Sequence, residues 1–296
     1  CSSLEKLNLS DCANLTLVNA EGDYNYAELD FRGCKNLVTL NMGFDITVLP
    51  DLSDCENLEK IELIGCESLK TTDISGLKKL KNFYIEGSYN VEALIANNNP
   101  ALESFYIDGS DYLTLLDLNG CKKLKSVAVY SGNPFTADLN GCSNLEEMVI
   151  DGAILDWQQL NKFKKLKYID VTINEMPCLF TFKNLLGMDD NNVTNVDGAT
   201  KRGYNYYVDA NTNEINFEYN NQTSCIRFGN RRHSKISEQS FSNYTAATNS
   251  TNGSYKHTYT CASCGTHTET ISFTKQDGVF LDVRGMKGNM SWVQQF

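Results

Sequence analysis

Residues 121–150 read CKKLKSVAVYSGNPFTADLNGCSNLEEMVI and contain one phrase twice. Each copy begins with a cysteine, has a leucine three residues later and ends with two apolar residues spaced two apart, as in CKKLKSVAV and CSNLEEMVI. A D-L-N-G turn stands between the copies. Because the phrase recurs with little change from residue 1 to about residue 174, this part of the chain is predicted to be a stack of repeated coils.

The first residue of each unit follows its predecessor after 21 or 22 residues. These first residues, here called the head positions, are Cys12, Cys34, Cys55, Leu77, Asn99, Cys121, Cys142 and Phe163. Each head precedes an apolar triple such as Leu58, Ile61 and Leu63, whose last two members point the same way from a short strand. These strands are predicted to stack into one parallel sheet. A weaker echo, offset by about eleven residues, is expected to form the opposite wall.

The phrases LEKLNLSDC, LTLLDLNGC and CKNLVTL resemble leucine-rich repeats. They are similar to the short, cysteine-bearing repeats of secreted or surface-attached bacterial proteins. The resemblance covers residues 1–174 and implies a leucine-rich repeat solenoid that binds other molecules through a concave parallel β-sheet. It also implies a place at the cell surface or outside the cell, in the bacterial envelope. A fold does not by itself fix a function.

The repeats carry seven cysteines, Cys1, Cys12, Cys34, Cys55, Cys66, Cys121 and Cys142. One interpretation is a disulfide framework, which would suit an extracellular protein. The other is a set of buried free thiols that pack as small hydrophobic groups. We favour free thiols, because Leu77 and Asn99 occupy the same position in other units and a disulfide partner could not be replaced in this way.

Composition narrows the class of protein. A chain of 296 residues predicts two structural units, and 41% hydrophobic with 21% charged residues is typical of a folded soluble protein. The net charge of −11 argues against a nucleic-acid partner, which would need a basic stripe. No apolar run reaches the roughly 18 residues of a membrane span. Cys1 is either a point within a longer solenoid or the first residue of a lipid-anchored lipoprotein, and we expect a monomer.

Side chains that alternate with the buried members of each triple are predicted to line the concave face in three columns. The columns are Leu17, Thr39, Lys60, Asn82, Ser104, Ser126, Glu147 and Tyr168; Asn19, Asn41, Glu62, Tyr84, Tyr106, Ala128, Val149 and Asp170; and Glu21, Gly43, Ile64, Glu86, Asp108, Tyr130, Asp151 and Thr172. One interpretation is an ordinary solvated surface. The other is a binding platform for a protein segment, a basic peptide or a glycan. The candidate binding residues are Tyr84, Tyr106, Tyr130, Glu86, Asp108, Asp151 and Tyr168.

The repeat ends near residue 174, and residues 175–186 are predicted to cap the last coil. Residues 187–296 are rich in Asn, Thr, Ser and Tyr and predict a small antiparallel β domain. In it, YNYYVDANTNEINFEY is expected to form a hairpin, and KHTYTCASCGTHTETISF and GVFLDV further strands. Residues 242–254 are expected to be a mobile loop.

Two motifs in this region could carry chemistry. His257, Cys261, Cys264 and His267 have the spacing of a zinc knuckle, although the second C-x-x-C of a zinc ribbon is missing. A disulfide, local or to Cys225, and free thiols are the alternatives. The second motif is a basic run that is a solvated loop, an anion or glycan contact, or a contact with the acidic solenoid. It comprises Arg227, Arg231, Arg232, His233 and Lys235.

No nucleophile elbow, phosphate-binding glycine loop or ordered Ser-His-Asp set occurs in its usual context. The sequence therefore predicts a protein that is not an enzyme and needs no cofactor: a binding or adhesion module for a protein or carbohydrate. The alternative is a catalytic or zinc-dependent β domain with the repeats as a targeting arm.

Overall fold

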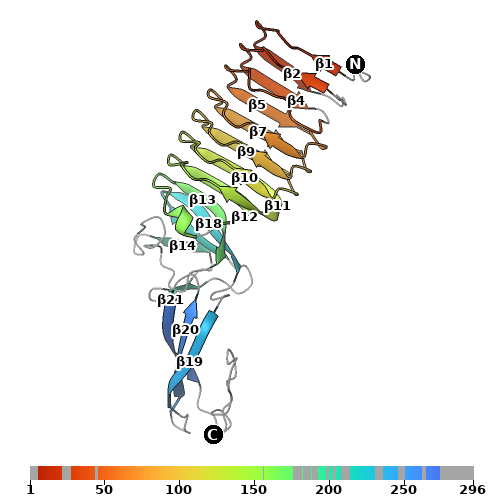
Figure 1. Ribbon diagram of the computed structural model, residues 1–296. Helices are drawn as coiled ribbons and strands as arrows, with labels where there is room; N and C mark the ends of the chain where they lie inside the picture. The colour runs from red at the N-terminus through yellow and green to blue at the C-terminus, as the bar shows by residue number, and fades with distance from the viewer. Residues whose placement is uncertain are drawn as a thin grey trace. The chain divides into compact units, whose positions relative to one another are not determined.

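The computed structural model describes residues 6–21, 28–43, 46–155, 157–175, 182, 188, 193–197, 200–202, 205–207, 214–230, 236–245, 251–261 and 265–273. The chain forms two compact units. The larger comprises Cys1–Met176 and Phe180–Arg231, and the smaller comprises Pro177–Leu179 and Arg232–Phe296. The larger unit is a parallel β-solenoid, and the smaller contains an antiparallel sheet (Figure 1).

One strand from each coil joins the main sheet of the solenoid. In spatial order these strands are β2 (Leu17–Glu21), β4 (Thr39–Gly43), β5 (Lys60–Ile64), β7 (Asn82–Glu86), β9 (Ser104–Asp108), β11 (Ser126–Asp138), β12 (Glu147–Leu155) and β13 (Tyr168–Glu175). Neighbours are parallel, and equivalent residues lie side by side, as Ile61, Phe83 and Phe105 do. The predicted parallel sheet is confirmed.

The weaker echo of the repeat forms a second wall of short parallel strands. These are β1 (Lys6–Asn8), β3 (Glu28–Asp30), β6 (Thr71–Asp73), β8 (Ala93–Ile95) and β10 (Leu115–Asp117). β1 pairs with β3, while β6, β8 and β10 continue to the last residues of β11. Each central strand of this wall buries one residue, such as Leu94 or Leu116, which explains its weak sequence signal.

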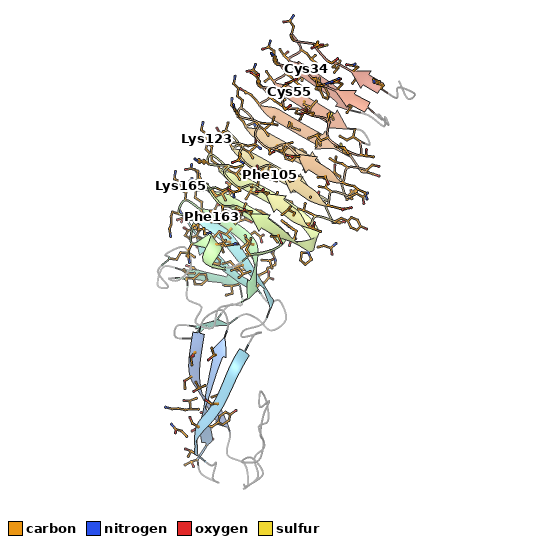
Figure 2. All side chains as sticks on the ribbon, in the orientation of Figure 1. Cys34, Cys55, Phe105, Lys123, Phe163 and Lys165 are labelled. Carbon is orange, nitrogen blue, oxygen red and sulfur yellow. The ribbon has the colours of Figure 1, made fainter. Side chains whose placement is uncertain are left out.

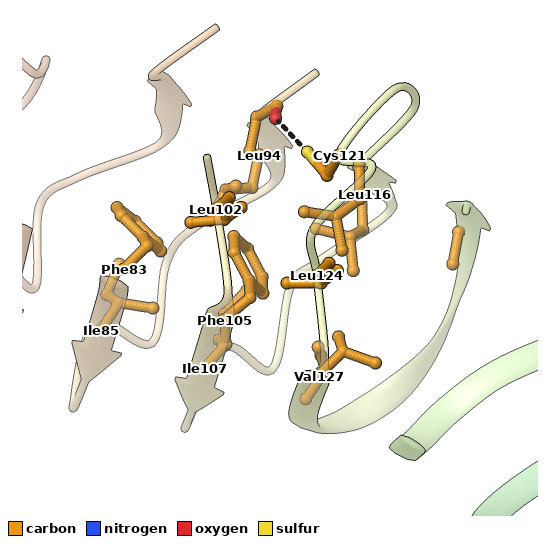
Figure 3. Close-up of a cluster of buried hydrophobic side chains, with 14 of the residues drawn as sticks. Phe83, Ile85, Leu94, Leu102, Phe105, Ile107, Leu116, Cys121, Leu124 and Val127 are labelled. Carbon is orange, nitrogen blue, oxygen red and sulfur yellow. Dashed lines mark hydrogen bonds between the residues drawn. The ribbon is translucent and has the colours of Figure 1, made fainter. Parts of the chain in front are cut away.

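Side chains from both walls fill the interior (Figure 3). Phe83 and Phe105 are each 1% exposed and stack with ring centroids 5.2 Å apart. Leu102 and Leu124, the first members of their triples, are fully buried beside them. Burial of each such side chain stabilises the fold by roughly 1.5–3 kcal/mol. The repeated apolar triples therefore form one continuous core.

The buried cysteine and asparagine side chains at the head positions tie their coils to the coil before. The thiols of Cys34, Cys121 and Cys142 donate to backbone oxygens 24 or 25 residues earlier, at 3.1–3.2 Å (Figure 3 shows the bond from Cys121). Asn99 donates its amide to the Ile74 and Ala96 carbonyls, at 2.9 Å each. Cysteine and asparagine thus exchange at this position because both supply a buried donor.

The cysteines confirm the prediction of free thiols where the structure describes them. Cys34, Cys55, Cys121 and Cys142 are buried and free. Cys12 is free and exposed. Cys66 does not belong to the head positions. It lies in the turn after β5, one coil before Ser88. The Cys66 N–H donates a hydrogen bond to the Ser88 hydroxyl at 3.2 Å.

Strands from later in the chain extend the main sheet past the last coil. β18 (Gln222–Asn230) pairs with β13 in parallel, β17 (Glu214–Tyr219) pairs antiparallel with β18, and β14 (Thr194–Asp197) pairs with β17. Asn220 and Asn221 connect β17 to β18 with φ of 49° and 64°, as a tight hairpin turn requires. Phe182 is buried against Phe217, with ring centroids 4.8 Å apart. These residues cover the end of the solenoid core.

The expected hairpin YNYYVDANTNEINFEY is wrong in its pairing. β16 (Asn205–Tyr207) pairs with β15 (Thr200–Arg202), and β17 pairs with β18 instead, because the two asparagines after β17 make the tighter turn. The sequence placed a separate β domain from residue 187, whereas β17 and β18 belong to the larger unit. The expected limits of the cap at 175–186 stay a prediction, since most of that segment lies outside the described residues.

The smaller unit contains β19 (Ile236–Thr245), β20 (Gly253–Cys261) and β21 (Gly265–Phe273), all antiparallel, as the sequence predicts. Two threonine pairs cross from β20 to β21, with hydroxyl oxygens 2.9–3.0 Å apart. The two ends of the expected loop at 242–254 are strand; residues 246–250 and the GVFLDV segment lie outside the described residues. α1 (Trp157–Leu160) is a single turn, and nothing helical in the described ranges has the length and apolarity of a membrane span.

Candidate binding face

The candidate site is the outward side of β4, β5, β7, β9, β11, β12 and β13, here called the exposed sheet face. The first two predicted columns are continuous in the sheet register. The third column is wrong at its end. β12 and β13 slip after Ile150, so that Thr172 pairs with Ile154 and not with Asp151. The register of β12 against β13 shifts by three residues between these pairs, an irregularity that the constant spacing of the repeats does not reveal.

Three tyrosines lie next to one another on this face. The rings of Tyr84 and Tyr106 are parallel within 5°, with centroids 4.7 Å apart, because neighbouring strands lie about 4.8 Å apart. Tyr130 is tilted by 59° against Tyr106, with centroids 6.0 Å apart, and is 39% exposed. The row of three rings, here called the tyrosine row, offers an aromatic surface across β7, β9 and β11.

A carboxylate follows Tyr84 and Tyr106 two residues later along the same strand. The Tyr84 hydroxyl donates to Glu86, and the Tyr106 hydroxyl donates to Asp108 Oδ2 at 3.5 Å. The bond to Glu86 raises the pKa of Tyr84 to about 12, and burial followed by the charge of Asp108 raises the pKa of Tyr106. Both hydroxyls are therefore neutral donors at ordinary pH. Asp108 and Asp151 flank Tyr130 in register, which makes this end of the face acidic.

Tyr168 lies apart from the tyrosine row, in register with Glu147 at the last coil. Burial, and then the charge of Asp170, raises the pKa of Tyr168. Arg227 reaches Asp170 from β18 in an ion pair and also lies 3.6 Å from Glu214. The sequence left three interpretations of the basic run. For Arg227, the ion pair with Asp170 supports contact with the acidic solenoid. The other members of the run, Arg231, Arg232, His233 and Lys235, lie outside the described residues.

Two exposed tyrosines were not predicted from the sequence. Tyr89 is 49% exposed and Tyr112 is 60% exposed, in the turns that follow β7 and β9. A Cβ on Gly109 would lie 2.9 Å from Cε1 of Tyr89, so this ring lies over the turn directly after Asp108. Tyr89 lies two residues after Gly87 and Tyr112 lies three residues after Gly109, so the repeat places them at different positions of the turn and gave no signal for the pair. They add aromatic area beside the acidic end of the exposed sheet face.

The predicted zinc knuckle is only partly described. Cys261 pairs with Gly265 and Tyr259 with His267 in the β20–β21 register, so the three residues 262–264 connect the two strands. Cys264 lies outside the described residues, within which no cluster of metal-binding side chains occurs. The zinc site of His257, Cys261, Cys264 and His267 therefore stays a prediction. Metal analysis of native protein, with and without chelator, tests it.

Cys225, the suggested disulfide partner of this motif, is a free buried thiol. Its Sγ donates to Glu214 Oε2 at 3.3 Å, and burial raises its pKa to about 12. A disulfide that links Cys225 to Cys261 or Cys264 is therefore not present, and the local disulfide and the free thiols remain alternatives for the knuckle.

No family model matches the chain, and no curated protein matches it. Among solved structures, the chain is similar to the functional domain of InlJ from Listeria monocytogenes, which includes a cysteine ladder. The identity is 16% over 77% of this chain and 67% of that chain, with a TM-score of 0.33. The coils themselves define this protein as a parallel β-solenoid with repeats like leucine-rich repeats.

Proposed function

We propose that this protein is a non-enzymatic binding module that holds a protein segment or a glycan on its exposed sheet face. The single observation that carries the proposal is the tyrosine row, three adjacent rings flanked by Glu86, Asp108 and Asp151. Tyrosine is favoured at interfaces because it gives a large contact area and a hydroxyl at a small entropic cost. The resemblance of the coils to surface-attached bacterial proteins supports a role outside the cell.

The charge of the face favours a cationic protein segment as the ligand. Lysine or arginine side chains interact favourably with the faces of aromatic rings, by about 0.5–1 kcal/mol at exposed sites. Carboxylates beside the rings add ion pairs at the rim. A glycan would use the same surface differently, with sugar rings over the tyrosines and hydroxyls bonded to the carboxylates.

The test is a pull-down from host or envelope extract with the intact protein. The variant carries Tyr84→Ala, Tyr106→Ala and Tyr130→Ala, and we expect it to lose the captured ligand. The control carries Val48→Ala and Leu115→Ala, which are 69% and 39% exposed and belong to the opposite wall. If both variants capture what the parent captures, the exposed sheet face is not the binding site.

A further inference from the structure

A tetrapeptide, Lys-Lys-Leu-Lys, recurs in alternate coils of the solenoid. It occupies residues 78–81, 122–125 and 164–167, which are 44 and 42 residues apart, or two coils each time (122 − 78 and 164 − 122). The coil before each of them carries ENLE, PALE or SNLE at the equivalent place, residues 56–59, 100–103 and 143–146. The solenoid thus has a second period of two coils, which the apolar pattern does not show.

The lysine at the fourth position of each tetrapeptide forms an ion pair with the glutamate at the equivalent position of the preceding coil. Lys81 pairs with Glu59 at 2.8 Å, Lys125 with Glu103 at 2.8 Å and Lys167 with Glu146 at 2.5 Å. Alternation of lysine and glutamate at this position is therefore explained by contacts within the solenoid. These paired lysines and glutamates add no net charge to this side of the solenoid.

The lysines at the first two positions of each tetrapeptide are not explained by such ion pairs. Lys79 and Lys165 donate to the neutral side chains of Asn57 and Asn144, both at 2.5 Å. Among the residues that the structure describes, no carboxylate forms an ion pair with any of the six lysines at these positions. Lys123 and Lys165 act only by their charge on Glu103 and Glu146, which are already paired with Lys125 and Lys167. The six lysines are all exposed and are here called the lysine edge: Lys78, Lys79, Lys122, Lys123, Lys164 and Lys165. Figure 2 shows Lys123 and Lys165 on the same side of the solenoid.

The spacing of the lysine edge limits its partner. Coils rise by about 4.8 Å each, so lysine pairs recur roughly every 10 Å over a row roughly 20 Å long. Pro100, Ala101, Ser143 and Asn144 fill the coils between the pairs and add no charge. A stable protein interface covers about 800 Å² per partner, far more than so narrow a row. Duplex DNA carries one charge per about 1.7 Å, far denser than the lysines.

We propose that the lysine edge binds a linear anionic polysaccharide that carries a carboxylate or sulfate on each disaccharide. Such a polymer is narrow, and its anionic groups recur at a spacing of the same order as two coils. This site is separate from the ligand of the exposed sheet face, since the two surfaces have opposite charge. The net charge of −11 repels a polyanion at long range, so the complex depends on local contacts and weakens as salt is added.

The probe is a set of chondroitin sulfate oligosaccharides, titrated against the intact protein by calorimetry at low salt. Neutral dextran and oligo-dT are the comparison polymers. The test variant carries Lys78→Gln, Lys122→Gln and Lys164→Gln. It is expected to bind about tenfold more weakly, because each exposed ion contact contributes a factor of about two. The control carries Lys6→Gln, Lys70→Gln and Lys256→Gln, which changes the net charge equally, and is expected to keep its affinity.

A second variant tests the spacing without a change of net charge. The double variant Lys122→Ser, Ser143→Lys moves one lysine to the next coil. Residues 122 and 143 are equivalent in the repeat, and both are exposed. We expect about threefold weaker binding from the loss of contacts in register. Circular dichroism establishes that both variants are folded.

Four results would overturn the proposal. They are equal affinity of the parent and the Lys78, Lys122, Lys164 variant, equal loss in the control variant, tighter binding of oligo-dT than of chondroitin sulfate, and parent-like affinity of the swapped variant. Sedimentation velocity tests whether the partner is a second copy of this chain. If the parent self-associates and the Lys78→Gln, Lys122→Gln, Lys164→Gln variant does not, the lysine edge is an interface between copies and the proposal is wrong. Binding of chondroitin sulfate by the tyrosine variant is expected to be unchanged, which separates this site from the exposed sheet face.

Discussion

Replacement of Asn99 by alanine is expected to lower the free energy of unfolding by about 3 kcal/mol. Asn99 is fully buried at a head position and donates to two carbonyls at 2.9 Å. In the alanine variant the Ala96 carbonyl keeps the Cys121 thiol as a donor, while the Ile74 carbonyl loses the amide. Loss of the hydrogen bonds costs about 1 kcal/mol each, and burial of a carbonyl without its donor adds about 1 kcal/mol or more.

Two further substitutions at Asn99 separate hydrogen bonding from packing. Asn99→Cys recreates the residue found at Cys121 and keeps a donor, so it is expected to cost about 1 kcal/mol. Asn99→Leu recreates the residue found at Leu77. It removes both donors but also removes Asn99 Oδ1, a buried oxygen without a partner in the described structure, and it fills the space. We expect its cost to lie between those of cysteine and alanine.

The assay is urea denaturation followed by far-ultraviolet circular dichroism, with the slope m compared among variants to establish that the same surface unfolds. The expected order of stability is parent, cysteine, leucine, alanine. A leucine variant as stable as the parent, or an alanine variant that loses less than about 1 kcal/mol, would refute the idea that buried donors at the head positions hold the coils together.

Three other predictions address packing, electrostatics and the end of the solenoid. Phe105→Ala is expected to cost about 3–5 kcal/mol in urea denaturation, because it leaves a cavity beside Phe83; a cost below about 1 kcal/mol would contradict the continuous core. Burial raises the pKa of Cys55, Cys142 and Cys225 to about 12. Unfolded thiols lose their protons near pH 8.5, so this contribution to stability is complete below that pH and should fall as pH rises towards 12; a serine variant of Cys142 should show a shallower fall. Arg227→Ala should cost about 1 kcal/mol and raise hydrogen exchange in β18, whereas Lys256→Ala should change neither.

Much of the solenoid could be predicted because its information is local and repeated. The triple that contains Phe105 specifies the buried side of one strand, and constant spacing of the heads places equivalent residues of successive coils side by side. The positions of Tyr84 and Tyr106 in adjacent strands followed from the same spacing. Whether those tyrosines bind a ligand did not follow, since the same pattern suits a solvated face.

Contacts between distant parts of the chain could not be predicted in this way. β18 pairs with β13 across 55 residues, and no repeat marks it as a continuation of the sheet. The same holds for Arg227, which belongs to a basic run in the sequence but meets Asp170 in the fold. The register shift that separates Thr172 from Asp151 is likewise not marked by the repeat.

The sequence by itself determined the coil, its period and the residues that face inward, because these depend on spacings of two, eleven and about twenty-two residues along one chain. Only the tertiary structure decided which charges are compensated. Lys81 and Lys78 belong to the same tetrapeptide, yet Lys81 meets Glu59 from the preceding coil and Lys78 meets no carboxylate in the described residues. The physical reason is that ion pairing depends on distances between coils, and the linear order of residues does not contain them.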